Sequence, residues 1–201
     1  MISRIGALLL VVATTTAAAN VQAQSYRELD QRYLAPATPA TYTPLFGYSS
    51  PSSSSPIQRE MVNVSAAYRS GTIVINTNER RLYLVTGSGQ ALRYGIGVGR
   101  IGFTWAGATA VSAKREWPDW TPPSQMLRRR PDLPHHMAGG IENPLGARAL
   151  YLGRSMYRIH GSNEPETIGQ AVSSGCFRMT NEDVVDLYSR VPVGTRVVVL
   201  R

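Results

Sequence analysis

The feature that most constrains the fold is a series of short apolar segments separated by glycine-rich or polar turns. The first three segments are residues 72–76, 81–85 and 91–98, with turn-forming residues at 77–80 and 87–89 between them. Apolar runs of this length, bounded by such turns, predict a β-meander with its apolar side chains on one face. Further strands are predicted at 108–114, 149–152, 157–160 and 196–200.

One helix is predicted near the C-terminal end. Residues Thr180–Asp183 open it in the manner of a capping box, with two acids in the first turn. Apolar residues between 184 and 191 supply one face, and Gly194 separates the helix from the last strand. The predicted fold class is therefore mainly β, with one long helix near the C-terminus.

The first 70 residues have a different character. Residues 1–23 combine Arg4, an apolar stretch and the sequence Val-Gln-Ala, which predicts a signal peptide cut after Ala23. A retained membrane anchor is the alternative. Residues 24–70 include a long uncharged stretch of Pro, Ser and Thr, which predicts a flexible N-terminal segment. The folded domain is predicted at residues 71–201, in an exported protein.

Composition narrows the classes of partner. Lys and Arg number 21 against 13 Asp and Glu, a formal net charge of +8, which favours anionic partners. No predicted helix carries a basic stripe, so nucleic acid is not expected. No uninterrupted apolar stretch reaches about 18 residues, so no integral membrane protein is expected after signal cleavage. The single cysteine excludes a disulfide within the chain, and the adjacent pair His135-His136 is poor zinc geometry, so no metal is expected.

Cys176 and His160 carry the candidate chemistry. Cys176 lies in the sequence Ser-Ser-Gly-Cys-Phe-Arg-Met, and His160 ends a predicted strand and precedes Gly161. A thiol becomes a good nucleophile when its pKa is lowered, and an imidazole within hydrogen-bond reach does this. Gly175 allows a close backbone approach, so peptide N–H groups around Cys176 could face a developing oxyanion.

These residues resemble the signature of the YkuD-type L,D-transpeptidases. The resemblance runs from about residue 71 to residue 200 and includes the motifs at 97–100, 120–123, 143–146 and 167–169. Ser174 and Phe177 stand where members often have His and Ile or Val. Thr104-Trp105-Ala106-Gly107 replaces the usual Thr-Pro-x-Gly, which bears on the shape of the donor pocket.

The resemblance implies a β-sandwich of mixed sheets and a covalent mechanism without a cofactor. Cys176 would attack the third residue of a peptidoglycan tetrapeptide stem and release the terminal D-Ala. His160 would take the thiol proton, with a backbone carbonyl near Gly161 orienting its ring. Backbone N–H groups at Gly175 and Cys176 would bind the oxyanion, and the amine of a second stem would resolve the thioester as a 3→3 cross-link.

Several residues have two possible roles. Arg178 could bind a substrate carboxylate or form a structural ion pair. Trp120, in the irregular segment 116–143, could line the cleft or anchor a small core, and Asn143 could bind substrate or form a turn. Two serines, Ser173 and Ser174, are expected to hold the cysteine turn by local hydrogen bonds.

Two rival functions remain open. The same acyl-enzyme could be resolved by an amine of an envelope protein, which would anchor that protein to peptidoglycan, or by water, which would make the protein a hydrolase. Alternatively, the domain could be a wall-binding module without catalysis. Rapid reaction of Cys176 with a thiol probe at neutral pH would oppose that module, and an ordinary thiol pKa would support it.

Overall fold

The computed structural model describes residues 55–201. Eleven strands and three short helical elements form within this range. The strands are β1 (Glu60–Asn63), β2 (Ile73–Asn76), β3 (Arg81–Gly87), β4 (Gln90–Gly95), β5 (Val98–Gly99), β6 (Gly107–Glu116), β7 (Arg148–Leu152), β8 (Arg158–His160), β9 (Ala171–Ser173), β10 (Phe177–Arg178) and β11 (Arg196–Leu200). The helices are α2 (Ser124–Arg129), α3 (Asn181–Arg190) and the 3-10 turn η1 (Pro165–Thr167).

Nine of these strands form one mixed sheet in the order β1-β4-β3-β2-β11-β6-β7-β8-β10. Strand β11 pairs in parallel with β2, and β10 pairs in parallel with β8, while the other neighbours are antiparallel. Strands β5 and β9 form a separate parallel pair. The prediction of a mainly β fold with mixed sheets and a helix near the C-terminus is confirmed.

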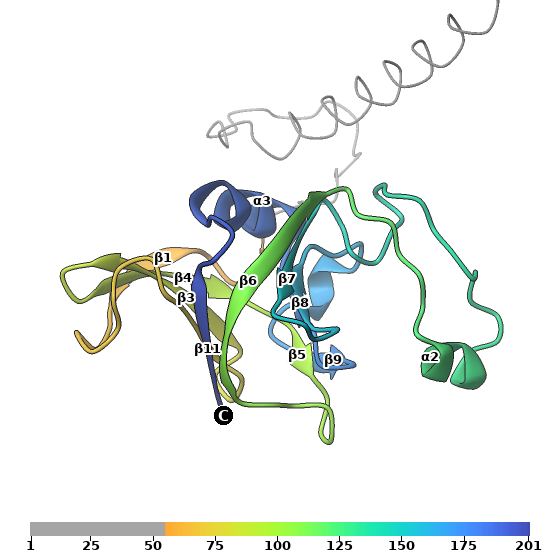
Figure 1. Cartoon of the computed structure of the whole chain (residues 1–201), viewed down its shortest axis with the longest axis horizontal. Helices are drawn as coiled ribbons and strands as arrows, with labels where there is room; N and C mark the ends of the chain where they lie inside the picture. The colour runs from red at the N-terminus through yellow and green to blue at the C-terminus, as the bar shows by residue number, and fades with distance from the viewer. Residues whose placement is uncertain (1–54) are drawn as a thin grey trace, which may run out of the picture. The chain divides into compact units, whose positions relative to one another are not determined.

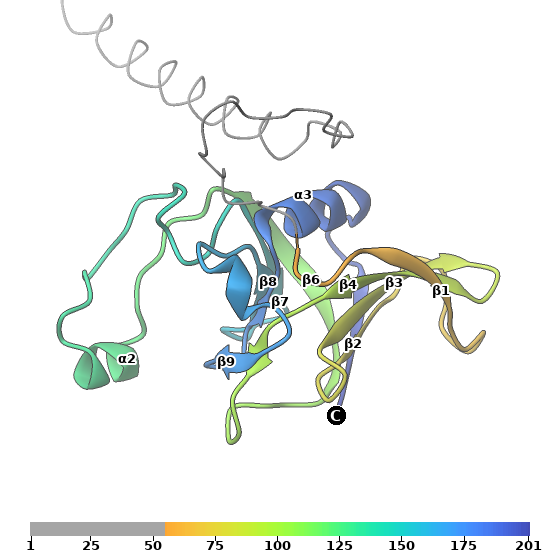
Figure 2. The same ribbon diagram turned by 180° about the vertical axis from the view of Figure 1, so that it is seen from behind.

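The ten-residue strand β6 joins the two halves of the sheet, because it pairs with β11 on one side and β7 on the other. Figures 1 and 2 show β6 between the β1–β4 region and the β7–β8 region, with α3 near one end. The main core lies among both halves and α3. It includes Ile73, Leu82, Tyr94, Leu150, Ile159, Phe177, Val184, Leu187 and Val197.

The helix α3 forms as its sequence predicts. The Thr180 hydroxyl accepts a hydrogen bond from the Asp183 N–H, which satisfies one of the free donors at a helix N-terminus. Val184, Val185 and Leu187 are buried on the face that packs toward β7 and β8. This arrangement fixes the first turn of α3 close to the end of β8, where His160 lies.

The structure differs from the sequence-based expectation at three places. Strand β1 lies within the segment predicted to be flexible, and it pairs with β4, so folded structure begins before residue 71. Helix α2 interrupts the segment predicted to be irregular. Strands β9 and β10 flank Cys176 but have only three and two residues, too few for a periodic pattern.

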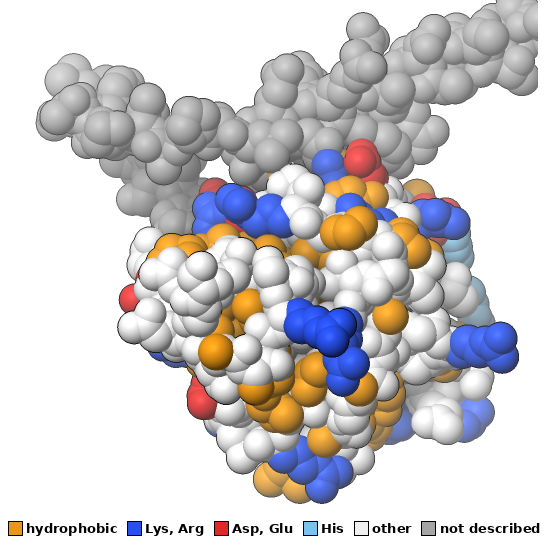
Figure 3. Space-filling view, turned by 60° about the vertical axis from the view of Figure 1, so that its left-hand side comes forward, with side chains coloured by type: hydrophobic (Ala, Val, Ile, Leu, Met, Phe, Trp, Pro, Cys, Tyr) orange, Lys and Arg blue, Asp and Glu red, His pale blue; other side chains and the backbone are white. Residues whose placement is uncertain are grey.

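The predicted signal peptide and the Pro/Ser/Thr stretch up to residue 54 lie outside the described residues. Within residues 55–201, the helices fall short of the length and apolarity needed to cross a membrane. Figure 3 shows one face of the molecule with Lys and Arg side chains at several points and sparse acidic side chains, in keeping with the net positive charge.

Candidate active site

Parallel pairing of β8 and β10 brings the two predicted catalytic residues to one end of the sheet. Arg178 lies opposite His160, and Phe177 lies opposite Ile159. Opposed residues of paired strands point to the same face, so Arg178 and His160 share a face, whereas Phe177 and Ile159 are buried in the core. Cys176 immediately precedes β10 and lines the same pocket as His160 and Arg178.

The backbone fixes the imidazole of His160. Its Nδ1 lies 2.6 Å from the carbonyl oxygen of Gly161, which is the backbone carbonyl that the family resemblance implies. A carbonyl can only accept, so Nδ1 carries the hydrogen and Nε2 remains as the basic nitrogen. His160 is 5% exposed, and burial, together with the charges of Arg178 and Arg158, lowers its pKa to about 3. The ring is therefore neutral at pH 7.

Cys176 is not pre-activated in this geometry. Its Sγ lies 3.8 Å from the carbonyl oxygen of Met156, and no hydrogen bond joins it to His160 within residues 55–201. Burial raises the pKa of the Cys176 thiol, although Arg158 and Arg178 act in the opposite direction. A lowered thiol pKa is therefore not present in this resting geometry, because desolvation of the thiolate outweighs the nearby positive charges.

Ser173 holds the turn that presents Cys176. Its hydroxyl donates to the carbonyl of Cys176 at 2.7 Å and accepts from the N–H of Gly175 at 3.1 Å. Gly175 has φ +109°, and a Cβ there would lie 2.6 Å from a ring carbon of Tyr157, so the position requires glycine. The expectation that Ser173 supports this turn agrees with these contacts.

The same contacts change the expected oxyanion site. The N–H of Gly175 already donates to Ser173, so it is not free to bind a developing oxyanion. The N–H of Cys176 has no hydrogen-bond partner among residues 55–201 and remains a candidate donor. Ser174 lines the pocket, whereas the Gly161 N–H bonds to the carbonyl of Arg148 at 3.0 Å.

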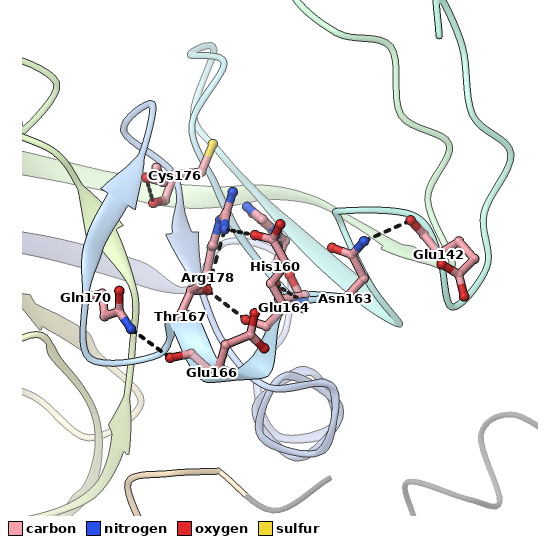
Figure 4. A network of polar contacts seen from close by, with 12 residues as sticks. Glu142, His160, Asn163, Glu164, Glu166, Thr167, Gln170, Cys176 and Arg178 are labelled. Atoms are coloured by element: carbon pink, nitrogen blue, oxygen red, sulfur yellow. Dashed lines mark hydrogen bonds and ion pairs between the residues drawn. The ribbon is translucent and has the colours of Figure 1, made fainter. Parts of the chain in front are cut away.

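Arg178 forms an ion pair and also lines the pocket. Its Nη1 lies 2.7 Å from Oε2 of Glu164, and Figure 4 shows the two side chains meeting beside His160. Thr167 is a weaker partner at 3.5 Å. Both readings of Arg178 are therefore compatible with the structure, because a partly exposed ion pair at a pocket wall can exchange partners with a bound carboxylate.

The pocket has a volume of about 1020 Å³, large enough for a peptide stem. The segment between β6 and β7 supplies one side of it, through Trp120, Met126 on α2, and Met137 among others. Trp120 thus lies where a cleft-lining residue is expected. Neighbouring Trp117 is instead buried. Its backbone N–H donates to the backbone carbonyl of Ala147 at the base of the segment.

Asn143 does not fit the predicted substrate-binding role. Only 1% of it is exposed, and it is absent from the pocket lining. Its Nδ2 donates to the carbonyls of Pro118, Met137 and Ala138, and its Oδ1 accepts from the N–H of Leu145. These four bonds tie the two arms of the segment together, so the turn-forming alternative is the one that the geometry supports.

Sequence reasoning missed two charged residues of the pocket. Arg158 and Glu164 both line the pocket, and Arg158 places a positive charge near Cys176. The alternation of β8 could have indicated Arg158, which shares a face with His160. No local pattern marks Glu164, because its role depends on the fold bringing it to Arg178. Within the described part of the chain, no group of three or more His, Cys, Asp or Glu could hold a metal ion.

A Cys, a His with a backbone-held Nδ1, and an Arg at the end of a mixed sheet define a candidate cysteine acyltransferase site. Residues 70–199 match the model of the YkuD family, the L,D-transpeptidase catalytic domain. The chain belongs to this family, which confirms the resemblance predicted from the sequence.

Two Escherichia coli K12 proteins show the extent of the similarity. The chain is 42% identical over 134 residues to the probable L,D-transpeptidase YbiS. This alignment covers 62% of this chain and 43% of YbiS. It is 39% identical over 137 residues to the probable L,D-transpeptidase ErfK/SrfK. This alignment covers 64% of this chain and 43% of ErfK/SrfK. The chain thus spans less than half the length of these relatives.

Solved structures agree in fold. An L,D-transpeptidase from Mycobacterium smegmatis aligns with a TM-score of 0.52 at 16% identity, over 65% of this chain and 58% of that one. L,D-transpeptidase 3 from Mycobacterium tuberculosis aligns with a TM-score of 0.52 at 17% identity, over 65% of this chain and 60% of that one. At such low identity these likenesses show the fold alone.

Proposed function

We propose that this chain is an exported cysteine L,D-transpeptidase that acts on peptidoglycan stem peptides. The observation that carries the proposal is the presence of Cys176, His160 and Arg178 on the wall of one pocket, with His160 Nδ1 held by Gly161. Membership of the family supports the same activity. The net positive charge suits an anionic wall polymer.

In the first step, Sγ of Cys176 attacks the carbonyl carbon of the third residue of a tetrapeptide stem. The thiol proton passes to Nε2 of His160, and the amide bond to the terminal D-Ala breaks. The imidazolium then returns this proton to the departing amine of D-Ala. The products are a thioester at Cys176 and free D-Ala.

The resting geometry supports the proposal that His160 is a general base that acts during attack. The imidazole is neutral and the thiol is protonated at pH 7, so no stable thiolate–imidazolium pair precedes substrate. Rotation of the Cys176 side chain away from Met156 toward Nε2 is then required in the substrate complex. Catalytic hydrogen bonds of this kind often tighten only when substrate is bound.

Positive charge and one backbone donor support the tetrahedral intermediate. The N–H of Cys176 is the proposed oxyanion donor, and the guanidinium of Arg158 lies near the same sulfur. Arg178 is proposed to bind a carboxylate of the donor stem, by exchange with Glu164. Trp120 is proposed to contact the stem from the segment that lies over the pocket.

In the second step, the side-chain amine of another stem attacks the thioester and loses its proton to His160. A new amide joins the two stems as a 3→3 cross-link, and the thiol is regenerated. An amine of an envelope protein or water could react in the same way, so these acceptors are alternative outcomes. We place the enzyme in the periplasm because residues 1–23 have the pattern of a signal peptide.

Mass spectrometry of the purified chain with disaccharide-tetrapeptide tests the proposal. We expect a dimer whose mass equals two substrates less one D-Ala, and none with Cys176→Ala. Tripeptide without dimer would show that water is the acceptor. If no product forms, even with candidate envelope proteins as amine donors, the transpeptidase assignment fails and a wall-binding module is favoured.

A further inference from the structure

Asn181, the first residue of α3, lies behind the turn that follows His160. We propose that Asn181 is a positioning residue that holds the Gly161 carbonyl against Nδ1 of His160 and so fixes the tautomer of the general base. The kinetic part of this inference rests on the proposed function, whereas the tautomer itself does not.

The contacts of the Asn181 amide oxygen place it between two turns. Oδ1 accepts a hydrogen bond from the N–H of Ala147 at 2.8 Å. A Cβ at Gly161 would lie 2.3 Å from this oxygen, and a Cβ at Gly146 would lie 2.2 Å from it. Both glycines therefore pack their backbone directly against one side-chain oxygen, with no room for a larger residue.

The backbone on both sides of Gly161 is held by its neighbours. The N–H of Gly161 bonds to the carbonyl of Arg148 at 3.0 Å, and the carbonyl of His160 accepts from the N–H of Met179 at 2.8 Å. These two bonds hold the His160–Gly161 peptide plane.

The Gly161 carbonyl belongs to the next plane, which packs against Gly146, since a Cβ there would lie 2.7 Å from the Gly161 carbonyl carbon. Contact of Asn181 with both glycines is a further restraint on this second plane. The resulting contact between the Gly161 carbonyl and Nδ1 of His160 is 2.6 Å.

The support itself is rigid. Asn181 is 8% exposed and is the first residue of α3. The Thr180 hydroxyl caps this helix. Val184 and Leu187, in the following turn of α3, are buried in the main core. A side chain anchored in this way cannot follow a movement of the loop, so it acts as a fixed reference for both glycine turns.

Removal of the amide has a specific chemical consequence. Asn181→Ala leaves the Ala147 N–H without this acceptor and opens space between the two glycine turns. The Gly161 peptide can then tilt, and the imidazole can populate the tautomer with hydrogen on Nε2. That tautomer cannot accept the thiol proton at Nε2, so the rate falls while substrate binding is little changed.

Nitrogen-15 NMR of histidine-labelled protein tests the tautomer directly, because the chain has only three histidines. We expect the Nδ1–H tautomer for His160 in the wild type at pH 7 and a detectable Nε2–H population in Asn181→Ala. Asn181→Asp retains an oxygen acceptor and should keep the wild-type tautomer. Thr180→Ala weakens the cap of the same helix and should also keep it.

Kinetics with the tetrapeptide supply the second readout. We expect kcat of Asn181→Ala to fall about 100-fold with little change in KM, the size that a small misplacement of a reacting group produces. An unchanged tautomer in a folded Asn181→Ala, or an equal change in Thr180→Ala, would overturn the inference. If the wild type forms no product, the proposed function fails, but the NMR result still decides the role of Asn181.

Discussion

Ser173 is the residue on which the geometry of the candidate nucleophile depends most directly. Its buried hydroxyl bonds to both Gly175 and Cys176, whereas Ser174 beside it is half-buried and makes neither bond. Both serines line the pocket, but only Ser173 is buried and makes the two hydrogen bonds that hold the turn. The sequence alone assigns both to the turn, because a run of two serines does not show which hydroxyl points inward.

Substitution of each serine by alanine separates these roles. Ser173→Ala removes two hydrogen bonds in a buried site, so we expect a loss of about 1–3 kcal/mol in the free energy of unfolding. We also expect slower dimer formation, by up to about 100-fold, since the sulfur shifts. Ser174→Ala serves as the matched control and should leave stability unchanged in denaturant titrations. Equal stability of the two variants would contradict this account.

At the scale of elements, β8 and α3 each carry a buried group with a shifted pKa. Burial lowers the pKa of His160, at the end of β8, to about 3. Burial raises the pKa of Asp183 in α3 to about 6, although the guanidinium of Arg59, 3.2 Å away, acts against this. The two groups are expected to have opposite effects on stability in the same pH range.

Between about pH 4 and pH 6, the unfolded chain binds a proton at His160 that the folded chain does not, so this group makes stability rise with pH. Folded Asp183 keeps a proton that the unfolded chain has lost, so this group makes stability fall with pH. We expect a nearly flat profile for the wild type in this range. His160→Gln should make stability decrease as pH rises, and Asp183→Asn should make it increase.

Thermal unfolding of the three proteins at several pH values measures these slopes. The difference between each variant and the wild type should be at most about 1.4 kcal/mol per pH unit, which is one proton. Parallel profiles for the wild type and His160→Gln would show that the imidazole titrates normally in the folded protein. The lowered pKa of His160 would then be contradicted.

Elements with several periodic residues could be predicted, and very short ones could not. Strands β2, β3, β7 and β11 and helix α3 lie close to their predicted ranges. Strand β1 has the sequence Glu-Met-Val-Asn, with three of its four residues exposed, and owes its structure to pairing with β4. Strand β10 has two residues and is defined by the neighbouring β8.

For the molecule as a whole, the sequence indicates the reacting residues better than their surroundings. Cys176, His160 and the Gly161 carbonyl come from one motif, and the fold brings them to one pocket. The raised pKa of the Cys176 thiol depends on burial, and the preceding Gly175 packs against Phe103, from a segment distant in sequence. Long-range packing of this kind leaves no local pattern, and the same holds for Glu164.

The central claim is that Cys176 forms a covalent acyl-enzyme with the stem peptide. Intact-protein mass spectrometry of the chain, mixed briefly with disaccharide-tetrapeptide, tests it most directly. We predict an adduct equal to the substrate mass less D-Ala, mapped to Cys176 after proteolysis, formed more slowly in His160→Gln and not at all in Cys176→Ala. Dimer formation without any adduct, or an adduct that persists in Cys176→Ala, would contradict the account.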